Sequence, residues 1–158
     1  MRRRRRGVLA GTLALGALAV VVVAWAPWDA EPTGRADAGD SALVARGLAV
    51  YAEQCASCHG ARLEGQPNWR ERKPDGKLPA PPHDDSGHSW HHADAQLFAI
   101  TKFGLEPYAP KGYRSDMPAY KDVLPDADIW AVLAYIKSRW SAENRARQAS
   151  IDRRARSP

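Results

Sequence analysis

The sequence predicts a small all-α domain that is preceded by a single N-terminal transmembrane helix. Residues 7–26 carry no charge and consist mainly of Ala, Leu and Val. Farther along, apolar residues recur at helical spacing over 41–54, 93–103 and 126–140. No segment shows the alternation of apolar and polar residues that is typical of a half-buried strand. Two cysteines are too few for a scaffold of several disulfides or for a metal site of four cysteines.

The apolar segment 7–26 is long enough to cross a bilayer. As a helix rising ~1.5 Å per residue, it spans about the ~30 Å hydrocarbon core of a membrane. Arg2 to Arg6 precede it directly, so the positive-inside rule places Met1 in the cytoplasm and residue 29 onward outside. We therefore expect residues 1–28 to form an uncleaved signal-anchor that crosses the membrane once.

A cleaved secretory signal is the alternative for the same segment. Ala24-Trp25-Ala26 has the form of a cleavage site, but Pro27 follows it and restricts the backbone on both sides of the bond. The apolar run also exceeds the ~7–15 residues of a typical signal core. Both features favour the anchor.

The chain after the anchor divides into a linker, one domain and a tail. Residues 29–39 are rich in small and polar residues, Pro and Gly, which is typical of a linker. Residues 40–140 have the length of one small domain. The tail 141–158 is rich in Arg and Ala, and we expect a fraying helix or disorder there.

Each predicted helix of the domain has its own start or stop signal. Asp40 or Ser41 can cap the helix 41–54. Gly104 ends the helix 93–103. The helix 126–140 follows Pro125 and carries acidic residues in its first turn, which suits the helix dipole.

Two long segments, 60–92 and 105–125, have no helical pattern. The first contains five prolines. A structureless loop of that length is uncommon in a compact domain. It becomes reasonable if the loop wraps a large prosthetic group that supplies the missing core.

The chemistry is concentrated in Cys55-Ala56-Ser57-Cys58-His59, which has the C-x-x-C-H spacing of covalent haem c attachment. Two thiols one turn apart can form thioethers with the two vinyl groups of one porphyrin. The adjacent His59 then lies under the iron and supplies an imidazole nitrogen.

Two other kinds of site use similar residues. A thioredoxin-like C-x-x-C follows a strand in a βαβ pattern, which this sequence lacks. A zinc site needs two further ligands, and no cysteine remains to supply them. The motif therefore predicts haem c, bound through Cys55 and Cys58.

Elimination points to Met117 as the second axial ligand of the iron. The chain has two methionines, and Met1 lies on the far side of the predicted membrane segment. Met117 sits in a polar loop rich in Pro, where it has little core to fill. A thioether is a known partner of His on haem iron.

Together these residues resemble the class I cytochromes c of bacterial electron-transport chains. The likeness covers residues 41–140 and is specific at Cys55, Cys58, His59 and Met117-Pro118. The resemblance implies a small fold of helices wrapped around one haem, in which the first and last helices cross closely. Gly47 against Leu133 or Tyr135 is the expected contact.

The resemblance also implies residues around the ligands. His59 is expected to donate its free ring N–H to a backbone carbonyl in a Pro-containing loop, for which Pro79 to Pro82 is the candidate. Trp90, Tyr113 and Arg114 are candidates to contact the haem propionates.

The implied role is an electron carrier, not an enzyme. Both axial positions are filled, which leaves no open site for a substrate. The expected location is the periplasmic face of a bacterial cytoplasmic membrane, and the expected partners are redox proteins that donate and accept single electrons.

Three alternatives stay open. The chain can be a haem c subunit or module of a larger dehydrogenase or oxidase. It can instead bind ligands as a peroxidase or sensor. Less favoured is a metal-handling protein that uses the four histidines between His83 and His92.

The charge distribution bears on partners. Residues 29–136 hold 11 basic and 16 acidic groups, a net −5, whereas residues 137–158 hold seven basic and two acidic groups, a net +5. An acidic body lacks the basic face of a nucleic-acid-binding domain. We therefore expect no nucleic acid as a partner.

The uncleaved anchor predicts the mass of the mature protein. Intact mass spectrometry and N-terminal sequencing of the membrane-extracted protein should recover the segment 7–26, because Pro27 obstructs cleavage at Ala26. A mature chain that begins at Pro27 would contradict the anchor and support a secreted form.

Overall fold

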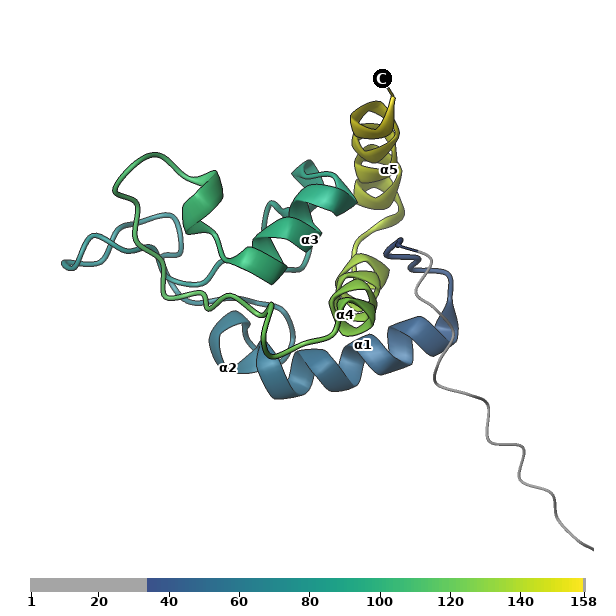
Figure 1. Cartoon of the computed structure of the whole chain (residues 1–158), viewed down its shortest axis with the longest axis horizontal. Helices are drawn as coiled ribbons and strands as arrows, with labels where there is room; N and C mark the ends of the chain where they lie inside the picture. The colour runs from purple at the N-terminus through teal and green to yellow at the C-terminus, as the bar shows by residue number, and fades with distance from the viewer. Residues whose placement is uncertain (1–33, 158) are drawn as a thin grey trace, which may run out of the picture. The chain divides into compact units, whose positions relative to one another are not determined.

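The computed structural model describes residues 34–157, and these residues form helices and loops without a strand (Figure 1). The α-helices are α1 (Ser41–Gln54), α2 (Ala56–His59), α3 (Asp94–Phe103), α4 (Asp126–Ser138) and α5 (Ala142–Arg156). Two short 3-10 helices are η1 (Ser89–His91) and η2 (Glu106–Tyr108). The all-α prediction is thus confirmed for the described residues.

The helix boundaries agree closely with the signals in the sequence. Asp40 is the N-cap of α1, and its carboxylate accepts hydrogen bonds of 3.0 Å from the backbone N–H groups of Ala42 and Leu43. Gly104 follows α3 at φ +80°. The predicted helix 126–140 is slightly too long, because α4 ends at Ser138.

No helix within residues 34–157 combines the length and the apolar character that a membrane crossing needs. The predicted anchor, residues 7–26, lies outside the described part of the chain.

The close packing of α1 against α4 organises the core (Figure 1). Gly47 is buried at the contact, and a Cβ atom placed there would overlap the carbonyl of Ala131 and lie 2.9 Å from the Cβ of Tyr135. The predicted contact of Gly47 with Tyr135 is therefore confirmed. The missing side chain lets the two backbones approach more closely than any other residue allows.

Large apolar side chains fill the space on both sides of this contact. Tyr51 from α1 packs its ring 5.3 Å from that of Tyr135, measured between centroids. On the other side, Phe98 of α3 stacks on Trp130 of α4 with centroids 4.3 Å apart. The buried members of the core include Tyr51, Leu63, Ile129, Val132, Leu133, Tyr135, Ile136 and Trp140.

The loop 60–92 is ordered by polar contacts to this core. The Tyr51 hydroxyl donates to the carbonyl of Gly60 at 2.9 Å, and the indole N–H of Trp140 donates to the carbonyl of His83 at 2.8 Å. Leu63 is buried and its carbonyl accepts from the backbone N–H of His83 at 2.8 Å. The side chains of Tyr51 and Trp140 therefore supply hydrogen-bond donors to loop carbonyls that take part in no helix or strand.

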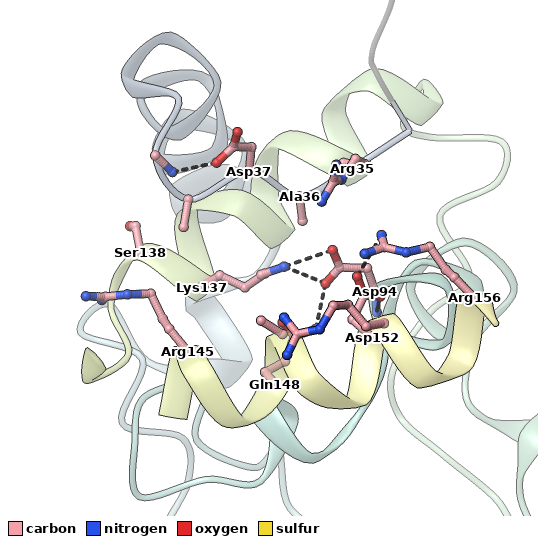
Figure 2. Close-up of a pocket in the computed structure, with 14 residues that line it drawn as sticks. Arg35, Ala36, Asp37, Asp94, Lys137, Ser138, Arg145, Gln148, Asp152 and Arg156 are labelled. Carbon is pink, nitrogen blue, oxygen red and sulfur yellow. Dashed lines mark hydrogen bonds and ion pairs between the residues drawn. The ribbon is translucent and has the colours of Figure 1, made fainter. Parts of the chain in front are cut away.

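The tail is a regular helix that packs on the domain, so of the two expectations, a fraying helix or disorder, the second is wrong. Asp152 of α5 is buried and accepts from the backbone N–H of Asp94 at 3.0 Å, which satisfies a free donor at the start of α3. Asp94 accepts from Lys137 at 2.6 Å and from Gln148 at 2.7 Å (Figure 2). The amino-acid composition of the tail does not predict this packing, because only a few of its residues face the domain.

The contact at Gly47 predicts the effect of a single methyl group. Gly47→Ala should lower the free energy of unfolding of the holoprotein by about 1–3 kcal/mol, because the added Cβ meets backbone that cannot move aside. Urea denaturation followed by circular dichroism measures this loss.

The exposed position Ala49 on the same helix provides the control. Ala49→Gly should cost about 1 kcal/mol through helix propensity alone. Propensity by itself would make Gly47→Ala stabilising, so an unchanged or raised stability of that variant would show that α1 and α4 do not touch there.

Candidate functional site

The C-x-x-C-H motif occupies the junction between α1 and α2. Cys55 caps the C-terminus of α1 through its N–H to the Tyr51 carbonyl, and its own carbonyl accepts from the N–H of His59, both at 2.9 Å. One turn of backbone therefore carries both thiols and the imidazole. The two cysteines are unbridged, with Cys55 half-buried and Cys58 exposed.

Burial raises the pKa of the Cys55 thiol to about 11, and the neighbouring Cys58 adds to the rise. A redox-active C-x-x-C works through a cysteine whose pKa is lowered, because the thiolate is the nucleophile. The Cys55 thiol therefore lacks the lowered pKa of a thioredoxin-like nucleophile.

His59 is buried and held in one orientation. Its Nδ1 lies 2.8 Å from the carbonyl oxygen of Pro81, so the ring donates from Nδ1 and its Nε2 stays available as a ligand. Burial lowers the pKa of His59 more than this hydrogen bond raises it. The imidazole is consequently neutral at neutral pH, the form that binds a metal. The carbonyl lies in the predicted segment, Pro79 to Pro82.

His83 packs against His59, with the ring centroids 4.0 Å apart. Its Nδ1 lies 3.1 Å from the Ser89 hydroxyl, and burial drives its pKa well below the ordinary value. His83 therefore supports the His59 ring as a neutral neighbour. Elsewhere in the loop, His88 stacks on Trp69 and His91 on Trp90. Within residues 34–157, no three side chains of His, Cys, Asp or Glu gather to hold a metal ion.

The loop that carries Met117 reaches the C-x-x-C-H motif through Tyr120. The hydroxyl of Tyr120 donates to the carbonyl of Gln54 at 2.7 Å, next to Cys55. Burial raises the pKa of Tyr120 to about 12, and the nearby thiols of Cys55 and Cys58 contribute to the rise. Met117, three residues before Tyr120, is half-buried.

Backbone contacts hold the same loop from other directions. The N–H of Met117 donates to the Ser115 hydroxyl at 3.0 Å, and the N–H of Tyr120 donates to the carbonyl of Thr101 in α3 at 3.2 Å. Tyr120 thus joins the Met117 loop to the residue before the motif, and Asp116 joins it to the loop 60–92 through Lys73.

One buried polar atom supports a prosthetic group with an acceptor oxygen. Trp90 Nε1 is shielded from solvent and has no hydrogen-bond partner within residues 34–157. Buried donors are rarely left without an acceptor. A haem propionate supplies such an acceptor, so Trp90 fits the role expected of it. Tyr113 is half-buried with the Arg72 guanidinium over its ring, and Arg114 is exposed.

Sequence reasoning missed two residues of this site. Tyr120 lies in the Met117 loop, but nothing local shows that its hydroxyl reaches Gln54, 66 residues away in the chain. The sequence pattern groups His83 with the other loop histidines, whereas the structure packs its ring against that of His59. The absence of a helical pattern around both residues hid their burial.

Comparison with known proteins gives one match. The family model described as Cytochrome c matches residues 44–140, which is more than half of the chain and includes the motif and Met117. No curated protein and no solved structure matches.

The hydrogen bond from the Tyr120 hydroxyl predicts a loss of stability when that hydroxyl is removed. Tyr120→Phe should lower the free energy of unfolding of the holoprotein by about 1 kcal/mol, because the Gln54 carbonyl loses its buried donor. Chemical denaturation at neutral pH measures the change.

Tyr108→Phe is the matched control, because Tyr108 is an exposed tyrosine in the neighbouring helix η2. The control should leave stability within about 0.5 kcal/mol of the wild type. Equal effects of the two substitutions would show that the Tyr120 hydroxyl does not fasten this loop.

Proposed function

Because the chain belongs to the cytochrome c family and is thereby a haem-based electron carrier, we propose that it passes single electrons between membrane or periplasmic redox proteins through one haem c. Cys55 and Cys58 would hold the haem by thioethers. His59 and Met117 would be the axial ligands of its iron.

The observation that carries this proposal is the orientation of His59. The imidazole is buried, neutral and held at Nδ1 by the Pro81 carbonyl, which leaves Nε2 as the ligand atom. A hydrogen bond to the second nitrogen of a ligating histidine fixes the ring and raises its basicity. The arrangement therefore suits His59 to bind a metal through Nε2.

The fastening of the Met117 loop supports the second ligand. Tyr120 ties the loop to the end of α1, where the thioethers would form. Haem supplies the one-electron chemistry, and a thioether ligand raises its potential relative to a second histidine. The chain would contribute two axial ligands, His59 from the motif and Met117 from its loop. Such a site suits electron transfer better than bond-making catalysis.

The cellular setting follows from the sequence. We propose that residues 1–28 anchor the chain in a bacterial cytoplasmic membrane, with the haem domain on the periplasmic face. The acidic body and the basic tail would steer oppositely charged partners, so association should slow as ionic strength rises. A haem c subunit of a larger oxidoreductase would use the same site.

Substitution of Met117 tests the ligand set. The ferric wild-type holoprotein should show the weak absorption band at about 695 nm that reports a Met–iron bond. Met117→Ala should lose this band and bind added imidazole. Met117→His should stay low-spin, with a midpoint potential lowered by on the order of 0.1 V, because imidazole replaces the thioether.

The opposite results point to another function. A wild-type protein without the band and with a high-spin ferric spectrum would contradict the electron-carrier site. It would favour the ligand-binding alternative, a peroxidase or sensor.

A further inference from the structure

A tight turn within the loop 60–92 presents two lysines side by side. The N–H of Lys73 donates to the carbonyl of Lys77, and the N–H of Gly76 donates to the carbonyl of Lys73, both at 2.8 Å. Gly76 adopts φ +81°, a conformation that other residues rarely take. Arg72 closes the turn further by donating to the Gly76 carbonyl at 2.6 Å. The turn is therefore held by its own backbone.

Both lysines bind one carboxylate in the Met117 loop. Lys73 Nζ lies 2.8 Å from Oδ2 of Asp116, and Lys77 Nζ contacts Oδ1 of the same side chain. The partners are 43 and 39 residues apart in the chain. Each oxygen of the carboxylate thus has its own cation, and we call this group the Asp116 clamp.

The clamp restrains the Met117 loop on the side that precedes Met117. Tyr120 holds the loop on the side that follows Met117, through Gln54. On the side that precedes Met117, the backbone N–H of Ser115 donates to the Glu106 carboxylate at 3.3 Å, and the Ser115 hydroxyl accepts from the N–H of Met117. Asp116 adjoins Met117 directly, so the clamp restrains the backbone next to the ligand from the loop that carries Pro81.

A single exposed ion pair contributes little to stability, but a network is stronger. The exposed fraction of the Lys77 side chain is 19%, that of Lys73 is 38% and that of Asp116 is 51%. The clamp is therefore suited to a local role, in which a small energy decides whether one loop residue stays on the metal.

We propose that Asp116 is a positioning residue that keeps Met117 on the haem iron through its pairs with Lys73 and Lys77. This inference rests on the proposed ligand role of Met117. Loss of the clamp leaves the haem attached and the fold intact, but it lets Met117 leave the iron more readily. High salt, which screens exposed charges, has the same effect in a weaker form.

Imidazole competition on the ferric full-chain holoprotein tests the clamp. Asp116→Asn keeps the shape of the side chain and removes its charge. Imidazole should bind this variant about three- to tenfold more tightly than the wild type, which is the range that two exposed ion pairs can supply. The band at about 695 nm should weaken in parallel, because it reports Met117 on the iron.

The pairing itself is tested by a cycle of variants. The double variant Lys73→Gln/Lys77→Gln should reproduce the effect, and combining it with Asp116→Asn should add nothing further. Asp116→Glu keeps the negative charge, so it should bind imidazole nearly as weakly as the wild type does. At ~0.5 M salt the difference between wild type and Asp116→Asn should shrink.

Asp122→Asn is the matched control, because Asp122 is an exposed acid of the same segment that pairs with Lys121 at 3.8 Å. It should leave imidazole affinity unchanged. If the wild type shows the band, two results would overturn the clamp while leaving Met117 as ligand: an equal effect of the two Asp variants, or no effect of Asp116→Asn.

A wild type without the band would overturn both proposals. If Asp116→Asn lowered the unfolding midpoint as much as Met117→Ala does, the effect of Asp116 would be on global stability and not on the position of Met117.

Discussion

The contact of α1 with α4 at Gly47 is the constraint on which the rest of the structure depends. Because the two backbones meet there, Tyr51 of α1 and Trp140 after α4 are placed in one core. Their polar atoms reach out of that core to the carbonyls of Gly60 and His83. The loop between those carbonyls then presents Pro81 to His59. The absence of a Cβ atom at Gly47 is thus coupled, through three partly buried hydrogen bonds, to the orientation of the His59 imidazole.

The same contacts explain how the loop 60–92, which contains no helix longer than the 3-10 helix η1, stays ordered. A loop in a compact domain must satisfy its backbone groups with something other than a ladder of its own. Here Tyr51 and Trp140 supply donors from the core, while Leu63 supplies buried apolar area within the loop. The loop 60–92 therefore lines the site. Within it, His83 packs against His59, which gives one of the loop histidines a packing role.

An ion pair joins the basic segment 137–158 to the acidic body 29–136: Lys137 of α4 pairs with Asp94 of α3. Asp152 of α5 accepts from the start of α3 and pairs with Arg156 of its own helix. The Asp94 and Asp152 carboxylates are buried and hydrogen-bonded as well as paired, the condition under which burial of a carboxylate is tolerated. The charges available for steering a partner are the remaining exposed arginines of α5 and the exposed acids of the body. A count of formal charge along the chain therefore overstates the field that the folded domain presents.

The sequence alone determined the helices α1, α3 and α4, the cap of α1 and the attachment chemistry of the site. Those features depend on local rules: helical periodicity, a capping aspartate and the spacing of two thiols and an imidazole along one turn. It also narrowed the carbonyl partner of His59 to four residues. Only the tertiary structure decided that the partner is Pro81, that Tyr120 bonds Gln54, that Asp116 binds two lysines and that α5 packs on the domain. Each of these contacts joins residues more than 20 positions apart, and a side chain in a loop or on a polar helix carries no local pattern that names its distant partner.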